Sequence, residues 1–139
     1  MATIIRPMLS EKNKYWIDKH RHYELKHFCL QYPEWKKAYA DCLDCDISMA
    51  IVGEDATNNI VHDPTGTRAV SRAYYSEKIK LVEQAAKEAD RYLWYYILLA
   101  VTEGFSYTYL KTKLEIPCGK DMYYDRYRKF FWLLSKLRD

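Results

Sequence analysis

The sequence predicts a mainly α-helical protein, and three observations lead to this fold class. Only four Gly and four Pro occur among 139 residues, and they fall between long segments that are compatible with helix. Within those segments, apolar and aromatic residues recur every three or four positions, which is the spacing of one helix face. A hydrophobic content of 49% beside 29% charged residues argues against disorder. The length fits one domain or two very small ones.

Residues 1–50 are expected to form an N-terminal helical hairpin. Ser10 is a candidate N-cap for a helix that runs to about Gln31. Pro33 then opens a second helix, which extends to roughly Asp46. Each helix carries an apolar and aromatic stripe, formed by Trp16, His20, Tyr23, His27 and Leu30 in the first and by Trp35, Tyr39, Cys42 and Leu43 in the second.

Residues 51–66 are predicted to be a linker between this hairpin and a C-terminal helical unit, residues 67–139. The linker contains two Gly, two Asn and one Pro, which favour turns over regular structure. A long amphipathic helix is expected from Thr67 to about Asp90. The next helix, over 91–103, is apolar on nearly all sides and is therefore the expected central helix of this unit.

A helix-turn-helix is predicted within residues 91–139. Gly104 is a natural left-handed C-cap and Ser106 a natural N-cap, so one helix ends and another begins almost at once. The new helix is short, because residues 115–119 form a turn with a proline and a glycine. The last helix, over about 119–137, has one apolar stripe and is expected to turn its other face outward. This stripe consists of Tyr123, Tyr127, Phe130, Leu134 and Leu137.

Basic residues are concentrated towards both ends of the sequence, although the formal net charge is only +3. Residues 1–37 carry eight Lys or Arg against four Asp or Glu, and residues 105–139 carry the same numbers. Residues 38–104 carry six against eleven. Segregated positive charge of this kind suits a surface that faces phosphate groups.

The C-terminal segment also carries a family resemblance, which covers roughly a third of the chain. The residues concerned are Val101-Thr102-Glu103-Gly104-Phe105-Ser106-Tyr107, Leu110, Leu114, Ile116-Pro117-Cys118-Gly119 and Tyr123-Tyr124-Asp125-Arg126-Tyr127-Arg128-Lys129-Phe130-Phe131. On these residues the chain resembles the C-terminal helix-turn-helix of small phage regulators of the RinA and ArpU type, which are similar to region 4 of bacterial sigma factors. The resemblance implies a phage or prophage origin, binding to promoter DNA and contact with RNA polymerase.

The predicted function is that of a phage-type, DNA-binding transcriptional regulator that reads the major groove with its last helix. Lys and Arg reach phosphates or guanine edges, and Tyr contacts phosphates or thymine methyl groups. The predicted DNA-binding residues are Lys111, Lys113, Lys120, Tyr124, Arg128 and Lys129. Double-stranded DNA is the expected partner, RNA polymerase or another host protein is a further candidate, and a homodimer is compatible with this class.

Two other interpretations fit the same residues. A phage protein-interaction module, acting as an inhibitor or co-regulator, would grip RNA polymerase or a host defence nuclease complex with the same aromatic and basic surface, because Tyr, Trp and Arg also dominate protein interfaces. A purely structural role, with three packed helices and a solvated outer face, also gives this pattern.

No enzyme, cofactor or metal site is expected. The phosphate-binding loop, HExxH and GxSxG motifs are all missing from the sequence. Cys42 and Cys45 form a CxxC motif, but the second short ligand pair of a structural zinc site is not supplied by the preceding His20, His22, His27 and Cys29. No apolar run approaches the roughly 20 residues of a membrane span and no secretory pattern opens the sequence, so a cytoplasmic location is predicted.

Overall fold

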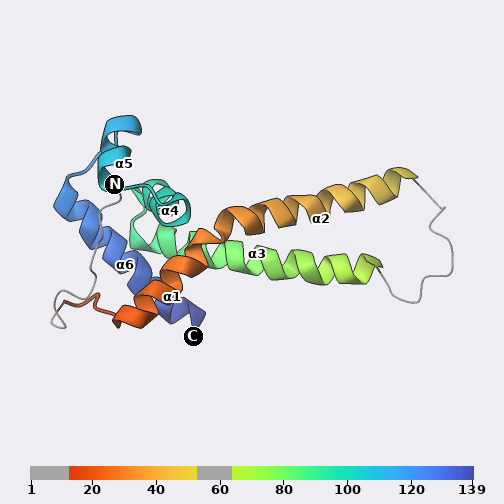
Figure 1. Ribbon diagram of the computed structural model, residues 1–139, viewed down its shortest axis with the longest axis horizontal. Coiled ribbons are helices and arrows are strands. Elements are labelled where there is room, and N and C mark those ends of the chain that lie inside the picture. The colour runs from red at the N-terminus through yellow and green to blue at the C-terminus, as the bar shows by residue number, and fades with distance from the viewer. Residues whose placement is uncertain (1–12, 53–63) are drawn as a thin grey trace.

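The computed structural model describes residues 13–52 and 64–139, and these residues form α-helices without strands (Figure 1). The helices are α1 (Lys19–Leu30), α2 (Tyr32–Val52), α3 (Pro64–Ala89), α4 (Trp94–Glu103), α5 (Tyr107–Lys113) and α6 (Lys120–Arg138). The predicted mainly α fold class is confirmed at this level. No helix in the described ranges is both long enough and apolar enough to cross a membrane.

An antiparallel pair of helices, α2 and α3, is the longest feature of the molecule (Figure 1). The two helices lie side by side along their length, and their far ends extend away from the other helices as an arm. The C-terminal half of α3 belongs to the globular part, where α4 and α6 pack against it. The arm therefore begins where α2 leaves the globular part.

The structure corrects the N-terminal hairpin that the sequence predicts for residues 1–50. Gln31 is the one residue between α1 and α2, and its backbone is right-handed, with φ −81° and ψ −9°. A single residue in this conformation bends the chain without reversing it, so α2 does not fold back onto α1. Instead, α2 packs on α3, while α1 packs on α4 and α6. Of the predicted linker, 53–63 lies outside the described residues and the remaining positions belong to α2 and α3.

The first helix also begins later than expected. The candidate N-cap Ser10 lies outside the described residues, and α1 starts after Asp18, whose carboxylate accepts a hydrogen bond from the His20 N–H at 3.1 Å. Upstream, the Asn13 side chain accepts from the Tyr15 N–H at 2.9 Å, which holds this segment in a turn. The local hydrogen bonds of Asn13 and Asp18 thus compete with a longer helix.

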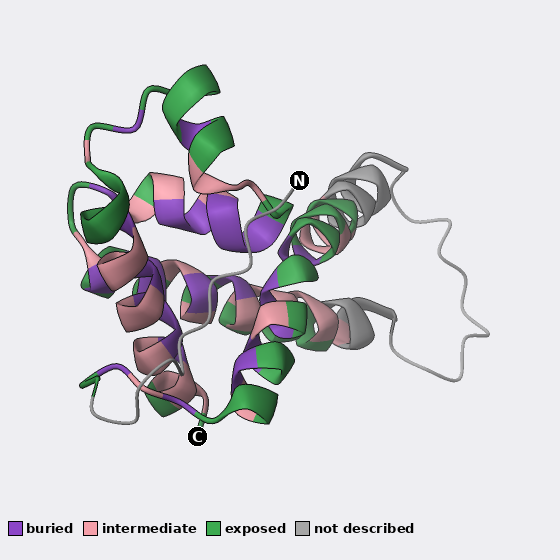
Figure 2. Ribbon diagram, turned by 60° about the vertical axis from the view of Figure 1, so that its left-hand side comes forward, coloured by how far each residue is buried: buried purple, intermediate pink, exposed green. Residues whose placement is uncertain are grey.

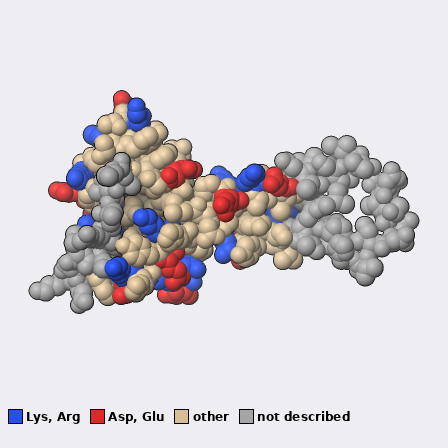
Figure 3. All heavy atoms as spheres, in the orientation of Figure 1, with Lys and Arg blue, Asp and Glu red and all other residues tan. Residues whose placement is uncertain are grey.

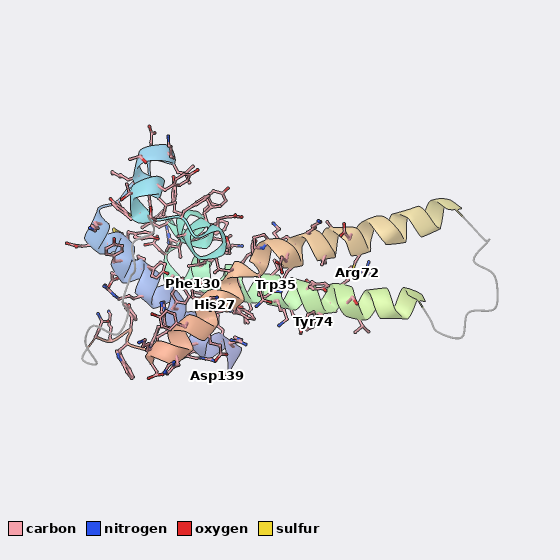
Figure 4. All side chains as sticks on the ribbon, viewed as in Figure 1. His27, Trp35, Arg72, Tyr74, Phe130 and Asp139 are labelled. Atoms are coloured by element: carbon pink, nitrogen blue, oxygen red, sulfur yellow. The ribbon has the colours of Figure 1, made fainter. Side chains whose placement is uncertain are left out.

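The buried residues form one core to which α1 through α6 all contribute (Figure 2). Fully buried members include Leu25 of α1, Val82 of α3, Ile97 of α4, Leu110 of α5 and Phe130 of α6. Figure 4 shows Phe130 within the globular part. The predicted stripe of α6 is buried, except that Leu137 is only partly covered. Because the core includes residues from α1 as well as α6, the described parts of residues 1–50 and 67–139 share one core and do not pack as separate bodies.

Polar contacts fasten α1 to the C-terminal end of α6. The Arg21 guanidinium donates to the Ser135 hydroxyl at 3.1 Å and to the Ser135 carbonyl oxygen at 3.0 Å. It also lies 2.6 Å from the Asp139 carboxylate. Arg138 pairs with Glu24 at 2.7 Å. Segments from opposite ends of the sequence are therefore held together.

An aromatic cage surrounds Lys78 where α3 passes α1 and α2. The Lys78 ammonium lies 4.7 Å from the ring centroid of Tyr74, 5.2 Å from that of Phe28 and 5.6 Å from that of Trp35. Trp35 of α2 and Tyr74 of α3 face the same space in Figure 4. Ring faces attract a cation at these distances, so the cage stabilises the base of the arm.

Candidate nucleic-acid interface

The chain passes from α4 to α5 through the two caps that the sequence predicts. Gly104 has a left-handed backbone with φ 75°, and its N–H donates to the Ala100 carbonyl oxygen at 3.1 Å. The Ser106 hydroxyl accepts from the Tyr109 N–H at 3.2 Å and caps α5. Both predicted caps are confirmed, and they fix the direction in which α5 leaves α4.

The turn between α5 and α6 is anchored to α5 by its apolar residue and by a tyrosine. Ile116 is fully buried, and its N–H donates to the Leu110 carbonyl oxygen at 3.1 Å. The Tyr107 hydroxyl donates to the Cys118 carbonyl oxygen at 2.8 Å. Glu115 takes a positive φ of 53°, which lets the chain change direction. These contacts position the start of α6 beside α5.

Tyrosine rings in tilted and edge-on contact pack at the junction between α5 and α6. The Tyr107 ring lies 5.3 Å from that of Tyr123 and 6.3 Å from that of Tyr124. Tyr123 in turn lies 6.0 Å from Tyr127. Burial raises the pKa of Tyr123 and of Tyr127 above the ordinary tyrosine value, so both hydroxyls stay protonated. The buried Tyr123 and Tyr127 are structural, whereas Tyr107 and Tyr124 reach the surface in part.

Five of the six predicted DNA-binding residues lie on α5 or on one side of α6. Lys120, Tyr124 and Arg128 are four residues apart and form what we call the α6 row, with the Lys120 ammonium 5.7 Å from the Tyr124 ring. Lys111 and Lys113 are exposed in the last turn of α5. The Lys111 ammonium is 3.4 Å from the Ile116 carbonyl oxygen, which places it at the turn that leads into α6.

The sixth residue, Lys129, lies on a different side of α6. Successive helical residues are rotated by about 100°, which carries Lys129 away from Arg128 and the α6 row. It lines a concave surface together with Lys87 and Arg91 from the end of α3 and the turn that follows. Sequence reasoning missed Lys87 and Arg91, because only the packing of α3 against α6 brings them beside Lys129.

Among the described residues, other side chains cover the outward face of α6 over its C-terminal half. Further along, the Tyr15 ring covers Trp132 with their centroids 5.4 Å apart, and Tyr15 is itself buried. The Lys136 ammonium lies 3.5 Å from the centroid of the same Trp132 ring. A ligand that approaches this face therefore meets Lys120, Tyr124 and Arg128.

Acidic residues interrupt the basic surface. Figure 3 shows Lys and Arg interspersed with Asp and Glu over the globular part, rather than a uniform basic face. Asp121 lies in the first turn of α6, where the helix dipole favours a negative charge. Asp125 pairs with Arg126 at 2.8 Å. Asp125 therefore has a cationic partner, and Asp121 occupies a favourable position at the start of α6.

The histidines and cysteines of α1 and α2 do not assemble into a metal site among the side chains that the structure describes. His22 is buried edge-on to the Phe131 ring, with centroids 4.8 Å apart. Burial, helped by the nearby Lys26, lowers the pKa of His22 to about 4. Cys29 is fully buried, and burial raises its pKa. The CxxC motif is incompletely described, because Cys45 lies among the side chains outside the described set.

No family model, curated protein or solved structure matches this chain. The candidate interface is therefore defined by the geometry of α5, α6 and their neighbours.

Proposed function

We propose that the protein binds double-stranded DNA as a transcriptional regulator, with the N-terminal half of α6 in the major groove and α5 beside the phosphate backbone. The observation that carries this proposal is the placement of five exposed or half-exposed candidate residues around one anchored turn. In a helix-turn-helix the second helix enters the groove while the first crosses the backbone. We assign these two roles to α6 and α5.

The residues divide between these roles by position. Lys111 and Lys113 extend from the last turn of α5 and would contact phosphates, which position the protein without reading sequence. The α6 row faces the groove, where Arg128 suits the bidentate acceptors of guanine and Tyr124 suits a phosphate or a thymine methyl group. Asp121 would accept a hydrogen bond from cytosine and repel other base edges, so it contributes to specificity.

The regulatory part of the proposal rests on the resemblance. Small phage regulators and region 4 of sigma factors act at promoters, which makes RNA polymerase the second partner that we propose for this chain. A homodimer would show itself as two half-sites one helical turn apart, about 34 to 36 Å.

The test is binding to a labelled duplex of random sequence, measured by fluorescence anisotropy over a series of salt concentrations. We expect an affinity that falls steeply with salt, by about 0.9 in log K per log salt for each phosphate contact. Lys120→Gln with Arg128→Gln should weaken binding. The matched control, Lys19→Gln with Lys37→Gln, removes two exposed cations that belong to neither α5 nor α6 and should bind nearly as the parent does. Absence of binding at low salt, or equal loss in both pairs, would reject the proposal.

A protein-interaction module is the second candidate, and exposed tyrosines favour it. Tyr92 is 74% exposed and Tyr95 54% exposed at the start of α4, next to the partly buried Trp94 and Tyr96. Aromatic residues of this kind are typical of interface hot spots. Under this candidate, Tyr92→Ala with Tyr95→Ala would abolish capture of RNA polymerase from a purified preparation while duplex DNA is not bound at any salt concentration.

A further inference from the structure

A basic concavity lies at the corner where the end of α3 and the start of α4 meet α6. It has a volume of about 470 Å³ and is distinct from the α6 row. Lys87 and Arg91 line it from the α3 side, and Met122, Arg126 and Lys129 line it from α6. Side chains from separate helices thus converge on one hollow.

One ion pair makes the floor of this concavity rigid. Arg126 lies 3.0 Å from one carboxylate oxygen of Asp90 and 2.8 Å from the Asp125 carboxylate. The other oxygen of Asp90 accepts hydrogen bonds from the N–H groups of Tyr92 and Leu93, both at 2.8 Å. Arg126 and Asp90 therefore satisfy each other and leave little charge for a ligand.

The remaining cations of the concavity have no acidic partner. Within the described part of the chain, Lys87, Arg91 and Lys129 form no ion pair. The Lys87 ammonium lies 5.0 Å from the centroid of Trp94. The Arg91 guanidinium donates to the Tyr92 hydroxyl at 2.7 Å and lies 4.7 Å from the same ring. Aromatic rings orient a cation without neutralising it, so these charges remain available to an anion.

Glu88 is the acid at the rim, and its carboxylate accepts from the Gln84 amide at 3.1 Å. Three unpaired cations against this one carboxylate leave the hollow positive. Convergent Lys and Arg side chains in a concave site suit a phosphate group, which offers several strong acceptor oxygens.

We propose that this concavity binds a phosphate of the DNA backbone beside the N-terminal half of α6. The inference rests on the proposed function and deepens it. Lys87, Arg91 and Lys129 would contact this phosphate, in addition to the phosphates that Lys111 and Lys113 contact. A phosphate contact from a second part of the fold would help to fix the orientation of the protein on the duplex.

The experiment compares the salt dependence of duplex binding for the full chain and three variants. Lys87→Gln with Arg91→Gln should weaken binding about ten-fold or more at moderate salt and make the slope of log K against log salt less steep by about 1 to 2. Glu88→Gln keeps the hydrogen bond with Gln84 and removes the rim charge, so it should strengthen binding. Lys19→Gln with Lys37→Gln is the control for net charge, and circular dichroism verifies that each variant is folded.

The outcomes separate this inference from the proposed function. One outcome would reject this inference alone. The parent would bind DNA and the double substitution of Lys120 and Arg128 would weaken binding, but the double substitution of Lys87 and Arg91 would leave the salt slope unchanged. The concavity would then not contact DNA. If the Lys19 and Lys37 control loses as much slope as the Lys87 and Arg91 pair, the effect is one of total charge, and the inference also fails. If the parent does not bind DNA at low salt, both proposals are rejected together.

Discussion

The carboxylate of Asp90 joins the corner between α3 and α4 to the guanidinium of Arg126 on α6, at 3.0 Å. The Asp90 side chain is 9% exposed, and each of its oxygens has a partner. Burial acts to raise the pKa of Asp90, but hydrogen bonds from the Leu93 and Tyr92 N–H groups and from Arg126 outweigh it and hold the pKa below its ordinary value. Asp90 therefore holds the turn before α4 and also binds Arg126 of α6.

Substitutions of Asp90 and Asp125 should lower the free energy of unfolding by different amounts. Asp90→Ala removes the acceptor of the Tyr92 and Leu93 N–H groups, which costs about 0.5 to 1.5 kcal/mol for each hydrogen bond lost, and leaves Arg126 with only its exposed partner. Asp90→Asn keeps an acceptor for the two N–H groups and should lose less. Asp125→Ala breaks the more exposed pair and should cost about 1 kcal/mol or less. Urea unfolding of the three variants at neutral pH gives this order, and an Asp125 variant as unstable as Asp90→Ala would contradict it. Because the folded pKa of Asp90 is depressed, its contribution is present at neutral pH and is lost as the pH falls below about 4.

His22 should make stability depend on pH in a different interval. Its pKa is lowered by burial from 6.5 to about 4, so the unfolded chain binds the proton first. The free energy of unfolding should therefore increase as the pH is raised from about 4 to 6.5. Lowering the pH from 6.5 to 5 should reduce it by about 2 kcal/mol. His22→Leu keeps an apolar side chain of similar size against Phe131 and should remove most of this dependence. Equal slopes for both proteins in urea unfolding at pH 5 and 6.5 would show that His22 is not the titrating group.

The aromatic cage predicts that Lys78 stabilises the base of the arm through its charge. Lys78→Met keeps the apolar stem and should cost about 1 to 2 kcal/mol, since three rings lose their cation. Lys80→Met provides the control, because Lys80 is exposed on the same helix and should change stability by less than about 0.5 kcal/mol. Urea unfolding followed by circular dichroism measures both effects. Equal effects of the two substitutions would show that the aromatic cage does not contribute to stability.

Two glycines should respond in opposite directions to the same substitution. At Gly104, a Cβ meets nothing within 4 Å, but the φ of 75° strains any L side chain, so Gly104→Ser should cost about 1 to 2 kcal/mol. Gly119 has a φ of −80° and caps α6 without a side-chain hydrogen bond. Gly119→Ser supplies such a cap and should stabilise by a few tenths of a kcal/mol. Thermal unfolding of both variants tests this contrast, which fails if their melting temperatures shift alike.

The sequence was most informative about the segment from α4 to α6. Gly104 and Ser106 determine their helix ends through local backbone preference and local hydrogen bonds, and both are visible in a few consecutive residues. The stripe of α6 was equally legible, because Tyr123, Tyr127 and Phe130 recur at helical spacing.

Helix pairing could not be obtained in the same way. An amphipathic stripe shows that a helix packs, but it does not identify the partner helix. At Gln31, the conformation of a single residue directs α2 away from α1. The cover of Tyr15 over Trp132 and the approach of Lys87 to Lys129 likewise join residues that are distant in sequence. Asp90 was a missed signal, since Asp side chains commonly bind the backbone N–H two residues on and hold a turn, as Asp90 does here.

The fastening of α1 by α6 has a consequence for the order of folding. Arg21 and Ser135 are 114 positions apart, so their contacts close almost the whole chain into a loop. Loop closure must be compensated before such distant contacts become favourable, whereas neighbouring helices form pairs at a smaller entropic cost. The docking of α1 is therefore expected late in folding, and in the native state its amides should exchange with solvent deuterium sooner than those of the buried turns of α3 and α6.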